Sequence, residues 1–292
     1  MKRILVPTDF SPTAERAFRF AVDIASRATG TVILYHIFNP LENTFTGTVK
    51  TREIYNTQSE TNLLKRLQRL KKKVLTNLPG VPVSTVVGYS PIVDNILGFA
   101  EHNKADLIVM GTQGISGLKK TIIGSTAVRI IERSDIPVLL IPENFKRKEP
   151  AHIVFAADTK FNGFKALELT LALAKLYNAT VTVVHLTDPF LTWEDRLKQV
   201  SESDAYIKTL QNTFHSPNLH FQILKAPSIH QALENLDTQI PHDMMVMIRG
   251  KKSTLERVFM DSFTKNMAYA TTHPLLVVPE EIKSEELNGK SL

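Results

Sequence analysis

Four small residues that could surround a phosphate group follow one apolar segment. In "DLIVMGTQGISGLKKTIIGST" (106–126) the apolar run reaches Gly111, and Gly114, Gly124 and Ser125 follow at the spacing Gly-x2-Gly-x9-Gly-Ser. A glycine at a strand exit can take backbone angles closed to other residues, and without a β-carbon it lets anionic oxygens approach main-chain N–H groups. The pattern predicts a phosphate-binding turn; ordinary turn glycines are the alternative.

The second half of this pattern lies where a helix is expected to begin. Gly124 and Ser125 precede the segment "STAVRIIERS" (125–134), which predicts a helix. The unpaired N–H groups and the positive dipole end at a helix start favour an anion. The strand exit and the helix start are therefore both expected to contact the same bound polyphosphate.

Alternating strands and helices must position these residues. The segment 11–30 predicts a helix with Ser11 as N-cap, Pro12 at the first helical position and Gly30 as its stop. A second Ser-Pro pair opens another predicted helix over 90–103. Nearly continuous Val/Ile/Leu runs are typical of parallel strands covered on both faces. They predict strands near 2–8, 31–37, 82–88, 105–110 and 137–142.

The chain repeats this order, which indicates an internal duplication. The stretch "RILVPTDFS" (3–11) aligns with "HIVFAADTK" (152–160), and "TVILYHIFNP" (31–40) aligns with "TVTVVHLTDP" (180–189) at the same offset. Later segments also correspond, "ADLIVM" (105–110) with "HDMMVM" (242–247) and "DIPVLLIPE" (135–143) with "THPLLVVPE" (272–280). A duplication defines the architecture before any function is argued.

Two tandem doubly wound α/β domains are therefore expected, each a five-stranded, mostly parallel, Rossmann-like sheet flanked by helices. We place them at residues 1–143 and 151–280. In such sheets ligands bind beyond the carboxyl ends of the strands. Asp9, Ile37, Gly111 and Gly114 should all lie there in the first domain.

The second copy has lost most of the glycine pattern. Gly111 corresponds to Ile248, Gly114 to Lys251 and Gly124 to Asp261, whereas Ser125 is retained as Ser262. A β-branched isoleucine should resist the special backbone angles, and a carboxylate at the helix start should repel phosphate. The second domain is expected to serve as a partner for the first.

Composition restricts the function classes further. The 292 residues are 43% hydrophobic and 22% charged, and neither a signal peptide nor a membrane-spanning run is evident, which predicts a cytoplasmic protein without a membrane partner. The net charge of +6 owes much to the basic segment 64–75, whose leucines keep helical spacing. We interpret this segment as a solvated helix face and expect no nucleic-acid partner.

Metal and thiol chemistry are not indicated. The absence of cysteine removes disulfides and thiolate sites, and the nine histidines lack metal-ligand spacing, so no structural metal is expected. His36 lies at a strand end and recurs as His185 in the second copy. We interpret this pair as structural and not catalytic.

With these motifs the sequence resembles the nucleotide-binding type of the universal stress protein family, over essentially its whole length and as two copies. The spacing Gly-x2-Gly-x9-Gly-Ser is that family's ATP-binding signature. The resemblance implies a site for ATP, with Mg²⁺ carried by the nucleotide, in the first domain. Its implied binding residues are Pro7, Asp9, Ile37, Met110, Gly111, Gln113, Gly114, Gly124, Ser125 and Thr126.

Within this site the resemblance implies a role for each part of the nucleotide. Asp9, in "VPTD", would contact the adenosine part and Ile37 the adenine. Met110 and Gln113 would border the phosphate turn, and Ser125 with Thr126 would bind phosphate oxygens. Alternatively, Asp9 serves only as a capping neighbour of the helix that starts at Ser11.

The sequence leaves the activity and the assembly open. A nucleotide-binding stress-response protein with little or no catalysis is the main hypothesis; a slow ATPase or autophosphorylating enzyme and a nucleotide-free scaffold are the alternatives. No Gly-x4-Gly-Lys-Ser/Thr motif occurs. The apolar closing strands of the two copies need covering, which predicts an intrachain pseudo-dimer or a homodimer. The protein partner is unknown.

Overall fold

The computed structural model describes residues 1–41, 48–112, 124–145, 149–157, 163–187, 193–225, 236, 238–250 and 273–280. Residue contacts divide the chain into two compact units. The first consists of residues 1–133 and 138–147, and the second of residues 134–137 and 148–292.

The first unit alternates strands and helices, as the sequence predicts. Its elements are β1 (Arg3–Pro7), α1 (Pro12–Ala28), β2 (Thr31–Phe38), α2 (Val49–Leu75), β3 (Val83–Tyr89), α3 (Ile92–His102), β4 (Leu107–Gly111), α4 (Ser125–Arg133) and β5 (Val138–Ile141). The five strands lie in the order β3-β2-β1-β4-β5, and all neighbours run parallel. The doubly wound α/β fold is confirmed.

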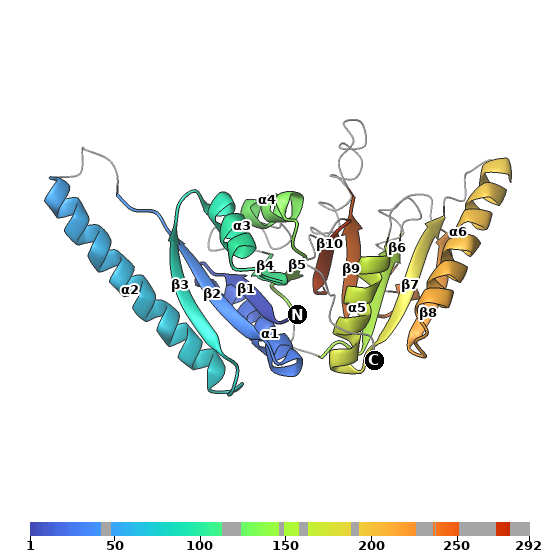
Figure 1. Cartoon of the computed structure of the whole chain (residues 1–292), viewed down its shortest axis with the longest axis horizontal. Helices are drawn as coiled ribbons and strands as arrows, with labels where there is room; N and C mark the ends of the chain where they lie inside the picture. Colours follow the sequence, from blue (N-terminus) through green and yellow to red (C-terminus); the bar gives the residue numbers. More distant parts are fainter. Residues whose placement is uncertain are drawn as a thin grey trace. The chain divides into compact units, whose positions relative to one another are not determined.

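Helices cover the sheet of the first unit (Figure 1), with α1 against β1 and β4 and α2 along β3. The stacked rings of Tyr35 and Phe99, with centroids 4.3 Å apart, join β2 to α3. The next residue, His36, contacts Phe10 instead. Because successive strand side chains point to opposite faces, α3 lies on the face away from Phe10. The central strands are consequently buried on both faces.

The helix α1 begins as the sequence predicts and ends in a different way. The Ser11 hydroxyl accepts a hydrogen bond from the Ala14 N–H at 3.1 Å, and Pro12 takes the first helical position. At the other end Thr29, with φ of 52°, and not Gly30 adopts the left-handed conformation. A β-carbon at Gly30 would lie 3.0 Å from the Lys2 carbonyl oxygen, so this glycine allows close chain approach.

The second Ser-Pro pair does not repeat the Ser11 cap, contrary to the sequence prediction. The Ser90 hydroxyl donates to the Asn39 side-chain oxygen at 3.0 Å. Pro91 is the N-cap of α3, and no side chain caps this helix. Asn39, which is distant in sequence, thus binds the hydroxyl group that the local pattern predicts as the helix cap.

The second unit has the same strand order. Its elements are β6 (His152–Ala157), α5 (Phe164–Tyr177), β7 (Thr180–Thr187), α6 (Trp193–Thr213), β8 (Leu219–Lys225), β9 (Met244–Arg249) and β10 (Leu275–Pro279). Parallel pairing gives β8-β7-β6-β9-β10, which matches β3-β2-β1-β4-β5. The duplication seen in the sequence is therefore a duplication of the fold.

An aspartate aligns two central strands in each unit. The Asp106 carboxylate oxygen Oδ2 accepts the N–H groups of Lys2 and Arg3, at 2.6 and 2.8 Å. In the second unit the Asp243 Oδ2 accepts the N–H groups of Ala151 and His152, at 2.9 and 3.1 Å. The start of the fourth strand is thereby joined to the start of the first.

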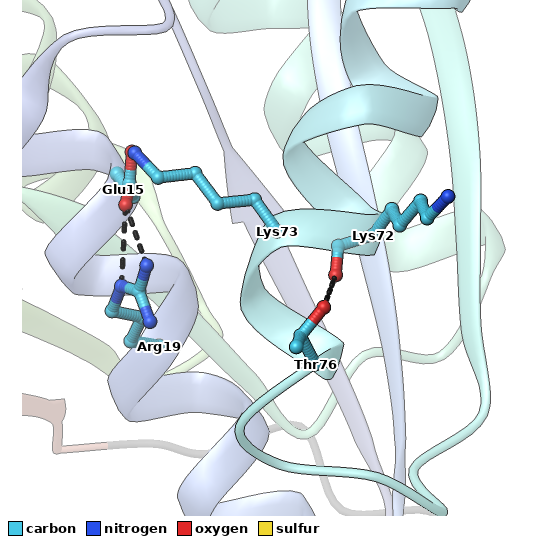
Figure 2. A network of polar contacts seen from close by, with 5 residues as sticks. All are labelled: Glu15, Arg19, Lys72, Lys73 and Thr76. Atoms are coloured by element: carbon cyan, nitrogen blue, oxygen red, sulfur yellow. Dashed lines mark hydrogen bonds and ion pairs between the residues drawn. The ribbon is translucent and has the colours of Figure 1, made fainter.

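An ion-pair network joins α1 to α2 (Figure 2). The Glu15 carboxylate accepts from Arg19 Nη2 at 2.8 Å on its own helix and from Lys73 Nζ at 2.7 Å on α2. Partial burial pushes the pKa of Glu15 upward, but the hydrogen bonds and charges of Lys73 and Arg19 outweigh it and lower the pKa. The folded state therefore favours the ionised carboxylate.

We expect the Glu15→Gln substitution to destabilise the protein in a pH-dependent manner. The stabilisation should be complete above the ordinary pKa of 4.5 and should disappear as pH falls through the lowered folded-state pKa. Because the Lys73 side chain is 62% exposed, we expect at most about 1 kcal/mol at pH 7. Urea unfolding of both proteins between pH 7 and pH ~3 measures this. Lys73→Gln is the matched variant, and a loss independent of pH would contradict the prediction.

Candidate functional site

The predicted binding residues lie at the carboxyl ends of neighbouring strands. β1 lies between β2 and β4, and the chain order reverses between β1 and β4. In open parallel sheets ligands bind at such a switch point. Pro7 ends β1, buried and paired with Tyr35, and Gly111 ends β4. The fold thus brings together residues that are about one hundred positions apart.

The helix α4 begins beside the exit of β4, as the glycine pattern predicts. The Gly124 N–H donates to the Thr112 carbonyl at 2.6 Å, and the Thr112 N–H donates to the Ile141 carbonyl at 3.0 Å. Ser125, exposed, and Thr126, half-buried, then form the first residues of α4. Helix geometry leaves their N–H groups without a partner inside the helix. An anion beyond β4 would meet these groups.

The same bond limits what Gly124 can do. Since its N–H is already used by the Thr112 carbonyl, Gly124 can offer a ligand close approach but not this donor. Gln113 and Gly114, the other predicted residues of this turn, lie outside the described residues.

Gly111 is required by packing and not by special backbone angles, so the expectation of such angles at this glycine is wrong. Its φ is not left-handed, and it pairs with Ile141 in the regular ladder of β4 and β5. A β-carbon at this position would lie 2.7 Å from Thr13 Cγ2 and 3.0 Å from the Thr13 backbone carbon. The glycine therefore lets the start of α1 approach the exit of β4.

The corresponding strand exit of the second unit is packed by different residues. Ile248, at the position of Gly111, pairs regularly with Val278, so the expected conflict with backbone angles does not arise. A β-carbon placed on Gly163, the N-cap residue of α5, would lie 2.5 Å from the Tyr206 hydroxyl oxygen and 3.2 Å from Ile248 Cδ1. Ile248 is 5% exposed and, together with Tyr206, occupies the space beside Gly163. Lys251, Asp261 and Ser262 lie outside the described residues.

The loop that carries Asp9 is closed by two side-chain hydrogen bonds. The Asp9 carboxylate oxygen Oδ1 accepts the Ser11 N–H at 2.9 Å, and the Thr8 hydroxyl accepts the Phe10 N–H at 3.1 Å. Asp9 therefore has the local role at the helix start that the capping alternative predicts. The same bonds hold its half-buried carboxyl group at the end of β1.

His36 has structural contacts, as expected from its repetition. Its Nδ1 lies 2.7 Å from the Thr8 carbonyl oxygen; because a carbonyl only accepts, Nδ1 carries the proton. Burial lowers the pKa of His36, and the Arg66 charge acts in the same direction, against the Thr8 hydrogen bond and the Asp9 charge. The ring is therefore mainly neutral at pH 7.

Two residues near Asp9 were not among the predicted site residues. The Phe10 ring lies 4.6 Å from the His36 ring, and the Arg66 guanidinium carbon lies 4.1 Å from the Phe10 ring centroid. Arg66 belongs to the basic segment that we interpreted as a solvated face. No local signal in the sequence connects it to Phe10, since 56 positions separate them.

The remaining predicted residues differ in accessibility. Ile37, half-buried near the end of β2, pairs with Gly88 of β3. Met110 is 7% exposed and pairs with Leu140, so its side chain belongs mainly to the core. In the described part of the chain no group of three or more His, Asp or Glu side chains could hold a metal ion. Likewise, no described helix is long and apolar enough to cross a membrane.

We expect Gly111→Ala to destabilise the protein by about 1–3 kcal/mol, the usual cost of overpacking. The added methyl group would overlap Thr13, partly against its backbone. Gly98→Ala is the matched control, because nothing lies within 4 Å of a β-carbon there and the residue is inside α3. Alanine should stabilise that helix by about 0.5–1 kcal/mol. Urea unfolding tests both variants, and equal effects would contradict the packing argument.

Comparisons with known proteins follow the two repeats. The chain matches the universal stress protein family over residues 1–142 and again over residues 151–279. Universal stress protein MJ0531 of Methanocaldococcus jannaschii is 34% identical over 141 residues, which cover 48% of this chain and 81% of that protein. MJ0577 of the same organism is 28% identical over 158 residues, which cover 48% of this chain and 94% of that protein.

The fold of the whole chain has a counterpart among solved structures. A universal stress protein from Archaeoglobus fulgidus aligns with a TM-score of 0.64 and 17% identity, over 95% of this chain and 96% of that one. At this identity the likeness concerns the fold alone. Because the family match spans both repeats, the chain belongs to the universal stress protein family as a tandem member.

Proposed function

We propose that the first domain binds one ATP molecule, with Mg²⁺ carried by the nucleotide, and that binding serves stress-response signalling with little or no catalysis. One observation carries this proposal: the Gly124 N–H bond to the Thr112 carbonyl places the start of α4 at the exit of β4. This corner lies at the sheet's switch point, where parallel sheets bind nucleotides. The N–H groups at the helix start suit a phosphate.

The family resemblance implies distinct roles for these residues along the nucleotide, and we propose the same roles here. Asp9 would receive the adenosine part, and Ile37 would contact the adenine beside it. Ser125 and Thr126 would bind phosphate oxygens through N–H and hydroxyl groups. The complete set that we assign to the site is Pro7, Asp9, Ile37, Met110, Gly111, Gln113, Gly114, Gly124, Ser125 and Thr126.

The second domain would act as a partner and not as a second binding site. Ile248 fills the space beside the start of α5, and the sequence places Asp261 where phosphate would meet a helix. We propose domains at 1–143 and 151–280 whose apolar closing strands pair within the chain as a pseudo-dimer, or between two chains. A partner protein would recognise the ATP-bound form of the chain.

The released small molecules provide a direct test of this function. The purified full chain is denatured, and mass spectrometry identifies what it releases. Stoichiometric ATP supports a binding sensor, whereas ADP alone indicates turnover. If nothing is released and calorimetry detects no ATP binding, the nucleotide-free scaffold replaces our proposal.

We predict a stoichiometry of one ATP per chain, because only the first domain retains the glycine pattern. Isothermal titration calorimetry of ligand-free protein measures this number. Two sites of equal affinity would show that Ile248 and Asp261 do not block the second domain.

Introducing the second domain's acidic residue into the first should abolish binding. In Gly124→Asp, a carboxylate about 4 Å from a phosphate charge costs on the order of 4 kcal/mol at an effective dielectric constant near 20. This corresponds to nearly a thousandfold weaker binding, measured by calorimetry. The Gly124 N–H bond to Thr112 uses only main-chain atoms, so the fold should persist.

Gly124→Asn is the control for backbone strain, because asparagine has a similar size, no charge and a better tolerance of left-handed angles. It should bind ATP clearly better than Gly124→Asp, and both variants should melt within a few degrees of the unmodified protein. If Gly124→Asp bound ATP within about threefold of the unmodified protein, the phosphate could not lie at the start of α4.

A further inference from the structure

The short loop after β1 contains an unusual backbone conformation. Phe10 has φ of 64°, in the left-handed region that a bulky aromatic residue rarely adopts. Such a conformation persists where the surrounding structure holds it, and it occurs often at functional sites. Phe10 lies directly after Asp9, the residue that would receive the nucleoside.

Two side chains from other elements hold the Phe10 ring. His36 of β2 lies on one side, with ring centroids 4.6 Å apart, and its Nδ1–H donates to the Thr8 carbonyl at 2.7 Å. Arg66 of α2 also contacts the ring, with its guanidinium carbon 4.1 Å from the ring centroid. A guanidinium over an aromatic face is an attractive cation–π contact. Residues of β2 and α2 thus contact the loop after β1 at Phe10.

We propose that Phe10 is a positioning residue for the nucleotide: Arg66 and His36 hold its ring, and the ring holds the loop that presents Asp9. This inference rests on the proposed function, in which Asp9 receives the adenosine part. Without the ring contacts, the left-handed conformation at Phe10 would lose its support, and the two hydrogen bonds of the loop, at 3.1 and 2.9 Å, would have to hold it alone. A smaller fraction of molecules would then present Asp9 correctly, and apparent affinity would fall by that fraction.

The position of α2 does not depend on Arg66 alone. Lys73 bonds Glu15 of α1 at 2.7 Å, and Gln68 Nε2 donates to the Thr85 hydroxyl of β3 at 2.9 Å. Leu67 and Val74 are fully buried. Replacing Arg66 should therefore remove its contact with Phe10 and leave the helix docked.

A double-mutant cycle on the full chain tests the proposal. ATP affinity is measured by calorimetry for Arg66→Gln, Phe10→Leu and the double variant. We expect each single substitution to weaken binding by about two- to fivefold, the range of an exposed cation–π contact. Both substitutions remove the same contact between Arg66 and Phe10. The ATP affinity of the double variant should therefore be no lower than that of the single variant that binds ATP less tightly.

Arg69→Gln is the matched control, since it removes the same charge from an exposed position three residues further along α2. Its ATP affinity should stay within about twofold of the unmodified protein, because a screened surface charge contributes little. Equal losses in Arg66→Gln and Arg69→Gln, or additive losses in the double variant, would overturn the proposal and assign Arg66 to general attraction of the phosphates.

An NMR titration of His36 separates this outcome from failure of the proposed function. The Arg66 charge lowers the pKa of His36 and the Asp9 charge raises it. Arg66→Gln should therefore raise this pKa more than Arg69→Gln does, with or without ATP. If the unmodified protein does not bind ATP, the proposed function and the nucleotide role of Phe10 both fail. If ATP binds but the two substitutions shift the pKa equally, only the inference about Phe10 is overturned.

Discussion

The alignment of β1 with β4 is the constraint on which the candidate site depends. The Asp106 carboxylate holds the N–H groups of Lys2 and Arg3, while the Asp106 N–H donates to the Arg3 carbonyl at 2.8 Å. Both strands contain five residues and Ile4 pairs with Leu107, so the two strands end within one residue of each other. The exit of β1 thereby lies beside the exit of β4, at the point where the chain order reverses. Asp243 repeats this arrangement in the second unit, which indicates that it belongs to the fold and not to one ligand site.

Aligned strand ends create a steric problem at the start of the following helix. In the first unit Gly111 on the strand makes room for Thr13 on the helix. In the second unit Ile248 occupies the strand position, and Gly163 before the helix allows the close approach of the Tyr206 hydroxyl group of α6. Both arrangements satisfy packing, but they leave different space at the strand exit. The two units thus pack equivalent strand exits with different residues.

The elements around the first strand exit are joined by polar and aromatic contacts as well as by the apolar core. Glu15 connects α1 with α2 through Lys73, and Arg66 of α2 lies against Phe10 in the loop between β1 and α1. These contacts join the helix that covers one edge of the sheet to the loop that carries Asp9.

The sequence alone predicted the features that arise from local chemistry. Apolar runs and a helix cap depend on a few neighbouring residues, so the strands and the Ser11 cap could be derived from the sequence. The duplication could be derived from the sequence as well, because the two copies retain similar segments in the same order. The tertiary structure decided which distant residues meet: Ser90 bonds Asn39 instead of capping its helix, and Gly111 serves the approach of Thr13 instead of an unusual φ. The contact of Arg66 with Phe10 is of the same kind. A residue type and its neighbours determine local conformation, but such contacts arise only when packing brings separate elements to within a few ångströms of each other.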